Sequence, residues 1–324
     1  EDLTQSRNSR GFKSLFKKRS TEPSTSDPPA NVNVKDKNAK PPITLHCLGY
    51  GTDHDSDFLR QIASATQGGT YYFVENDSGV GMAFGDALGG ILSVVAQNAV
   101  VNIQVPTENP SLEIVDVHHA QKVKRENGSY SVTIGDFYAE ETRDVVFEVS
   151  LATPIEGASS RIPHAEITVA FMDAIQKRPV KSVPMICYVD RPKGNKLSEA
   201  NHHVLVQWLR IYATEQMTEA DKLAKENLGG SRARIQEAIG RIKSTPGIQR
   251  SDPLVEQLIS ELNQVLQGLS SQAQYASTGA HYTRRTIQCH SMQRCSEATY
   301  ESATVYRGSS KMAMAKAFKE GTDS

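Results

Sequence analysis

Apolar and polar positions in the first third of the sequence follow the order of an α/β fold. Two short apolar runs, ITLHCLGYG and TYYFVEN, are each followed by a segment with apolar residues at helical spacing. Gly68 and Gly69 predict the end of the first helix. Strands and helices are predicted in alternation at residues 43–51, 55–69, 70–76 and 78–100. This order is typical of a doubly wound parallel sheet, which we predict for residues 43–98.

The periodicity changes at residue 99, where short β-branched segments begin. Six such segments fill residues 99–192, and Gly, Pro and Asn separate them at the spacing of an antiparallel β-sandwich. Asn127 and Gly128 lie between two of these segments and predict a tight hairpin turn. We therefore predict a β-sandwich for this region.

Helical spacing returns at residues 196–268 and predicts a helical hairpin or a small bundle. Asp252 followed by Pro253 is a typical helix start. The two flanking segments contain few long aliphatic residues. We predict a disordered basic linker at residues 1–42 and a loosely ordered basic tail at residues 269–324, with a helix at SSKMAMAKAFKE. The predicted fold class is a multidomain α/β, β and α chain.

The net charge of −1 hides an acidic body between two basic ends. Residues 1–42 carry nine Lys or Arg against five Asp or Glu, and residues 270–324 carry seven against four. The residues between them carry 20 against 28. No apolar run approaches the ~20 residues of a membrane span. The four cysteines are too few for a disulfide scaffold, so we predict a reducing, cytoplasmic location.

Two groups of residues have the spacing of metal ligands, but each lacks some of the ligands that the site requires. Asp53, Asp55 and Asp57 have calcium-loop spacing, but the loop's later Gly and Glu positions hold other residues, so we interpret Asp53 or Asp55 as a helix cap. Cys289, His290 and Cys295 provide at most three of the four ligands of a closed zinc site. Cys47 and Cys187 lie in apolar segments and are predicted to be small buried hydrophobes. No metal site or cofactor is expected.

No set of nucleophile, base and orienting group is recognisable in the sequence. His118-His119 and His202-His203 lack an acidic or Cys partner at a known spacing. The glycines around Gly81 and Gly89 precede no Gly-Lys-Ser/Thr, so they are interpreted as helix entry and close packing positions. We therefore expect the chain not to be an enzyme.

One acidic loop, AEETRD, lies between two predicted strands of the sandwich. Its charged residues are a candidate interaction surface, formed by Glu140, Glu141, Arg143 and Asp144. A solvated turn, and a contact between the sandwich and the α/β part, remain open as alternatives for the same loop.

The segment LHCLGYGTDHDSDFLRQIASATQGGTYYFVEN resembles the last part of a von Willebrand factor A (VWA) domain. GDFYAEETRDVVFEVSL is similar to the VWA-interdomain that follows VWA in plant VWA/RING-finger proteins and their non-plant relatives. The resemblance covers about residues 43–275. It implies a partial VWA domain, because only the last two of its usual six strands are found.

The resemblance lacks the VWA metal motif, Asp-x-Ser-x-Ser, so no metal ligands are carried over. The sequence also lacks an initial Met, and we expect it to begin inside a domain. A half-sheet would leave the edge of the ITLHCL strand unpaired, which predicts self-association through that edge.

These observations predict a non-enzymatic module for protein–protein interaction, with an unknown protein partner and no nucleic acid. One alternative is the substrate-binding part of a RING-type ubiquitin ligase whose RING lies upstream or is lost. A second alternative is a secreted matrix protein resembling the inter-α-trypsin inhibitor heavy chains.

Overall fold

The computed structural model describes six stretches of the chain, residues 43–107, 112–119, 123–151, 161–190, 199–294 and 305–322. The linker predicted for residues 1–42, and Cys295 of the candidate zinc ligands, lie outside these stretches. No helix in the described stretches is long and apolar enough to cross a membrane.

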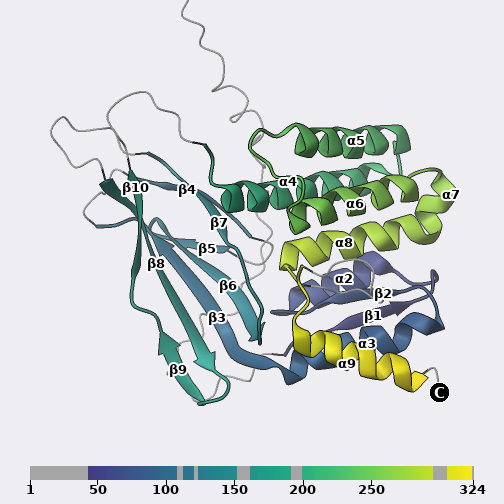
Figure 1. The fold of residues 1–324 in the computed structure, drawn as a ribbon, viewed down its shortest axis with the longest axis horizontal. Helices are drawn as coiled ribbons and strands as arrows, with labels where there is room; N and C mark the ends of the chain where they lie inside the picture. The colour runs from purple at the N-terminus through teal and green to yellow at the C-terminus, as the bar shows by residue number, and fades with distance from the viewer. Residues whose placement is uncertain are drawn as a thin grey trace, which may run out of the picture. The chain divides into compact units, whose positions relative to one another are not determined.

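A two-stranded parallel sheet with helices on both faces forms the first part of the fold. β1 (Cys47–Tyr50) and β2 (Tyr71–Val74) pair in parallel. α2 (Ser56–Ala65) follows β1, and α3 (Asp77–Leu92) follows β2 (Figure 1). The predicted order of strands and helices is confirmed.

The two faces of this sheet are covered by different helices. Ala63 of α2 packs with Tyr71 and Phe73, whereas Ala83 of α3 packs with Tyr72. This division follows from the alternation of side chains along a strand.

The helix predicted for residues 78–100 is too long. α3 ends at Leu92, and β3 (Val94–Gln104) begins two residues later. Val94 and Val95 are β-branched, which favours a strand. Apolar residues continue from the end of the helix into the start of the strand, so their spacing does not show where the helix ends.

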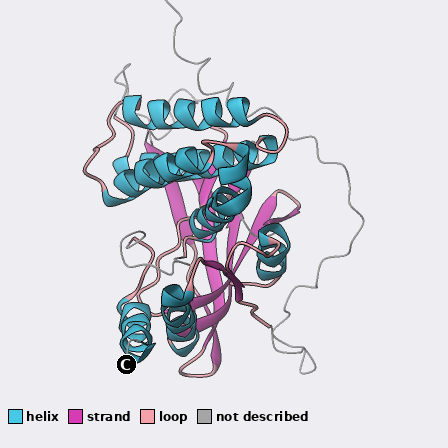
Figure 2. Cartoon of the chain, turned by 90° about the vertical axis from the view of Figure 1, so that its right-hand side faces the viewer, coloured by secondary structure: helices cyan, strands magenta, loops and turns pink. Residues whose placement is uncertain are grey.

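The β-rich part contains two antiparallel sheets. Six strands form the larger sheet in the order β10-β8-β3-β6-β5, with β9 beside β8. The strands are drawn in magenta in Figure 2. β4 (Ile114–His118) pairs only with β7 (Val146–Val149) among the described strands. The remaining strands are β5 (Val123–Glu126), β6 (Ser129–Tyr138), β8 (Arg161–Asp173), β9 (Arg178–Lys181) and β10 (Met185–Asp190).

Both sheets contribute to one hydrophobic core. Ile114 and Val117 of β4 pack with Ile103 of β3 and Val132 of β6. The predicted hairpin turn lies between β5 and β6, where Asn127 and Gly128 both have positive φ, 48° and 79°.

Most of the described residues from 202 onward are helical. Three long helices, α4 (His202–Leu223), α5 (Leu228–Ser244) and α6 (Pro253–Gly268), contact one another. Asp252 caps α6 as predicted, because its side chain accepts hydrogen bonds from the amides of Leu254 and Val255. Of the two predicted arrangements, a helical hairpin or a small bundle, three helices in mutual contact correspond to the small bundle.

The loosely ordered tail predicted from residue 269 onward is wrong for its described part. α7 (Gln272–Gln274) and a π-helical turn, η1 (Tyr275–Gly279), lead into α8 (Ala280–Met292). α8 contacts α2, α4, α6 and β2. Its buried positions are mostly polar, which is why its hydropathy did not reveal a packed helix.

The helix predicted at SSKMAMAKAFKE is confirmed as α9 (Ser309–Thr322), which lies beside α3 (Figure 1). Gly85 and Gly89 of α3 make this approach possible. A Cβ on Gly85 would lie 2.8 Å from the Met314 carbonyl oxygen, and one on Gly89 would lie 3.0 Å from Lys311 Cα.

We expect Gly85→Ala to destabilise the chain by about 1–3 kcal/mol, because backbone atoms of α9 must move to admit the methyl group. Gly240→Ala in α5 is the matched control, since no atom outside the neighbouring backbone of its own helix lies within 4 Å of its Cβ position. The control should stabilise by about 0.5–1 kcal/mol through helix propensity. Urea unfolding measures both, and effects of the same sign would contradict the close contact.

Candidate functional site

The acidic loop selected from the sequence connects β6 to β7 and is engaged by the chain itself. Arg143 Nη2 lies 2.7 Å from Glu141 Oε1, and both side chains are buried. The structure therefore buries two of the four candidate residues, Glu141 and Arg143, in an ion pair within the chain. Glu140 and Asp144 lie at the ends of the same loop and bind other elements.

Arg294, directly after α8, joins this loop to the α/β part. Its Nε and Nη2 lie 2.7 and 3.0 Å from the two carboxylate oxygens of Glu141. Nη1 donates to the Gly68 carbonyl oxygen at 2.5 Å, and Nη2 to the Asp136 carbonyl oxygen at 2.8 Å. The guanidinium also lies 3.8 Å from the ring centroid of Tyr138. One buried side chain thus connects three segments that are distant in sequence.

The charges of this cluster fix its protonation states. Burial alone would raise the pKa of Glu141, but the charges of Arg294 and Arg143 outweigh it and lower the pKa to about 2. Burial lowers the pKa of Arg143 to about 10. For Arg294, the charge of Glu141 outweighs burial and raises the pKa. At neutral pH all three side chains are charged.

The two ends of the loop bind helices. Asp144 accepts a hydrogen bond from His203 Nε2 at 2.7 Å, and its backbone exchanges two 2.8 Å hydrogen bonds with the Gln293 side chain. The Glu140 carboxylate accepts hydrogen bonds from the amide and hydroxyl of Ser309, at 2.7 and 2.8 Å. These contacts connect the loop to α4, α8 and the start of α9.

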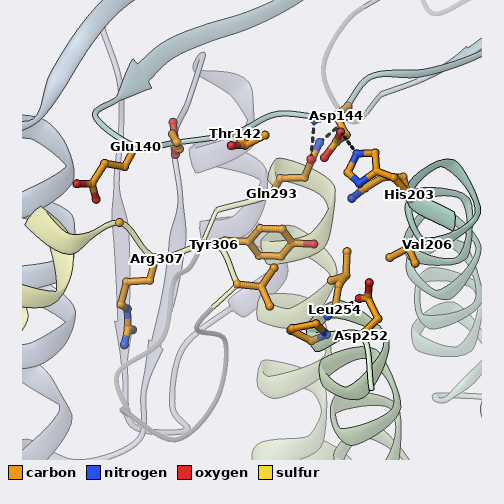
Figure 3. A pocket seen from close by; sticks show the side chains of 15 residues that line it. Glu140, Thr142, Asp144, His203, Val206, Asp252, Leu254, Gln293, Tyr306 and Arg307 are labelled. Carbon is orange, nitrogen blue, oxygen red and sulfur yellow. Dashed lines mark hydrogen bonds and ion pairs between the residues drawn. The ribbon is translucent and has the colours of Figure 1, made fainter. Parts of the chain in front are cut away.

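A pocket of about 300 Å³ lies against this loop, where α4 and α6 begin (Figure 3). Asp144 and His203 form one wall of the pocket, and the ring of Tyr306 also lines the pocket. Apolar side chains, including Val206 and Leu254, form part of the lining. Three of the candidate residues, Glu140, Glu141 and Asp144, belong to the lining, and Arg143 does not.

Several titratable side chains line this pocket. Its carboxylates already accept hydrogen bonds from the chain. Burial raises the pKa of Tyr306 well above its usual value, so its hydroxyl stays protonated near neutral pH and is a poor nucleophile. Among the described residues, no three His, Cys, Asp or Glu side chains are placed to hold a metal ion.

Behind the pocket lies a buried chain of polar groups that the sequence did not predict. His290 Nε2 forms a short hydrogen bond with Glu261, and His290 Nδ1 lies 3.2 Å from the Tyr306 hydroxyl. Arg210 Nη1 donates to the His290 carbonyl oxygen at 2.8 Å. His290 and Glu261 are 29 residues apart, so no local spacing could have revealed the pair.

Other predicted residues have structural roles. Asp55 caps α2 by accepting from the amides of Asp57 and Phe58, which confirms the capping interpretation. His118 and His202 each have an acidic partner that the spacing did not reveal, Glu148 at 3.1 Å and Asp252 at 2.9 Å, respectively.

The cysteines differ from their prediction in one case. Cys47 is half-buried beside α2 and Cys289 is buried, but Cys187 is exposed. Its strand, β10, is at the edge of the larger sheet, and none of its residues belongs to the hydrophobic core of the two sheets. The prediction of a buried Cys187 is therefore wrong.

Comparison with known proteins gives one family match and several structural ones. The Vwaint family model, described as VWA / Hh protein intein-like, matches residues 252–320. These residues lie in α6 to α9, whereas the sequence resemblance had assigned the interdomain to the β-rich part. No curated protein matches the sequence.

The solved structures show a likeness in fold. A von Willebrand factor type A protein from Catenulispora acidiphila is 15% identical, with a TM-score of 0.52, over 68% of this chain and 51% of that one. The chain thus spans about half the length of that protein. The ArnB paralog VWA2 from Sulfolobus acidocaldarius is 13% identical, with a TM-score of 0.38, over 79% and 59%. The family match and the Catenulispora likeness support a VWA-type domain in this chain.

Proposed function

We propose that the chain is a non-enzymatic, cytoplasmic module that binds other proteins through the open edge of β1. The proposal rests on the open edge of β1, with which no described strand pairs, and on the exposed apolar side chains beside it. A second copy of the chain is the first partner to test.

The backbone of β1 leaves hydrogen-bonding groups for a further strand. Cys47 N donates to the Thr70 carbonyl oxygen and Gly51 N to the Val74 carbonyl oxygen, both at 2.9 Å. Because hydrogen bonding alternates along a parallel strand, the amides and carbonyls of Leu48 and Tyr50 point to the open edge.

The side chains beside the edge form an apolar surface. Leu48 is 38% exposed and Tyr50 is 55% exposed. Tyr50 reaches toward α3, since its hydroxyl donates to Asp77 at 2.5 Å. A strand that added to β1 would cover part of this surface, which supports a binding role.

The titratable groups of the candidate site support a non-enzymatic role. Glu141 and Glu261 are buried and bound to Arg294 and His290 of the same chain, so removing either partner would leave a buried carboxylate unpaired. Cys47 and Cys187 are free thiols, which fits a reducing compartment.

We expect Leu48→Pro to weaken self-association about tenfold. Proline removes an amide that the β1–β2 pairing does not use, and its ring obstructs a strand added to the open edge. The lost hydrogen bond accounts for about 1 kcal/mol of this effect. Sedimentation velocity over a concentration series of the full chain measures it.

Leu48→Thr is the control, because it removes the same apolar side chain but keeps the amide. It should associate more strongly than Leu48→Pro. Equal association of the two variants would contradict strand addition, and a chain that stays monomeric throughout the series would contradict self-association at this edge.

A further inference from the structure

The larger antiparallel sheet has its own open edge, distinct from β1. β9 pairs with Ala170–Asp173 of β8, and β10 pairs with Arg161–Ile167 of the same strand. The two short strands therefore follow each other along one edge of β8 (Figure 1). Within the described residues, no strand pairs with their outer side.

β10 exposes apolar side chains on both of its faces. Met185 is 56% exposed, and Ile186 and Tyr188, which alternate with it, are 38% and 46% exposed. None of its side chains belongs to the hydrophobic core of the sheets. An exposed apolar edge strand is a ready template for pairing with another chain.

The two ends of this edge differ in charge. Lys177, Arg178 and Lys181 are exposed at the β9 end, and none of them forms an ion pair with a described carboxylate. At the other end, Arg161 lies 3.8 Å from Asp190, so that end is neutralised within the chain.

We propose that β10 binds an extended segment of a partner protein that has alternating apolar residues and an acidic end. The segment would add a strand to the sheet, and the acidic end would lie against the three cations of the β9 end. Pro184 lacks an amide hydrogen and limits the pairing to Met185–Asp190.

The charge asymmetry also sets the direction of the added strand. Antiparallel pairing is the more stable arrangement and is the one β10 already forms with β8. The C-terminal end of an antiparallel partner lies beside the start of β10, next to β9. The acidic residues should therefore follow the apolar residues in the partner sequence.

The test uses the full chain and two short labelled peptides of alternating Thr and Val, one ending in Glu-Glu-Glu and one in Lys-Lys-Lys. Fluorescence anisotropy measures their affinities, and hydrogen exchange locates the protected amides. The acidic peptide should bind more tightly and protect Met185–Asp190. The double variant Arg178→Glu/Lys181→Glu should weaken the acidic peptide about tenfold, as expected for two exposed ion pairs, and strengthen the basic one.

The control variant Lys225→Glu/Arg250→Glu makes the same charge change at exposed positions outside the sheet. It should alter either affinity less than twofold. The proposal is overturned if both double variants lose affinity equally, if wild type does not prefer the acidic peptide, or if protection appears outside β10. Absence of binding by both peptides also overturns it. None of these results bears on β1, where the Leu48 variants give a separate answer.

Discussion

Replacing Arg294 by Met should lower the free energy of unfolding by about 3–5 kcal/mol, the usual cost of removing one partner of a buried ion pair. Arg294 is 1% exposed and binds the Glu141 carboxylate through two nitrogens. The variant also leaves the carbonyl groups of Gly68 and Asp136 without this donor. Met keeps most of the side-chain volume, so the loss reports charge and hydrogen bonding. Urea unfolding at neutral pH provides the measurement.

Arg125→Met is the matched control for this prediction. Arg125 also pairs with a glutamate, at 3.1 Å from Glu113, but its side chain is 54% exposed. Exposed pairs of this kind contribute about 0–1 kcal/mol. If the two variants lose similar stability, the buried contacts of Arg294 with Glu141, Gly68 and Asp136 do not stabilise the fold as expected.

Local signals in the sequence were sufficient for much of the secondary structure. The order of strands and helices at residues 43–92 follows from apolar spacing, and Asp55 and Asp252 cap their helices as predicted. Asn127-Gly128 forms the expected turn because both residues tolerate positive φ. Each of these features depends on a few neighbouring residues, so it can be read without the tertiary fold.

Apolar spacing does not predict the packing of α8. The segment AHYTRRTIQCHSM has little apolar periodicity, yet its buried residues include His281, Arg285 and His290. Its helix is stabilised by polar partners elsewhere in the chain, such as Glu261 for His290 and the amide of Tyr71 for Gln288. Hydropathy cannot reveal burial that depends on partners that far away in sequence.

The candidate loop was found by its charge, but its role depends on tertiary contacts. A run of acidic residues between two strands is compatible with a solvated turn or a binding surface. The structure places Glu141 inside the chain because Arg294, 153 residues later, supplies its counter-charge. A single sequence does not contain that pairing as a local signal.

The same cluster predicts how stability depends on pH. The pKa of Glu141 falls from 4.5 to about 2 on folding, so its ionised form contributes about 3 kcal/mol above pH 4.5, and this contribution is lost as the pH falls toward 2. Glu141→Gln lacks the contribution at every pH. Its stability deficit relative to wild type should therefore be largest at pH 7 and shrink steadily below pH 4.5, measured as urea unfolding at several pH values. Glu113→Gln, at an exposed pair, should show a small deficit with little change over the same range. A deficit for Glu141→Gln that is the same at pH 7 and pH 3 would show that the ion pair with Arg294 does not control the charge of Glu141.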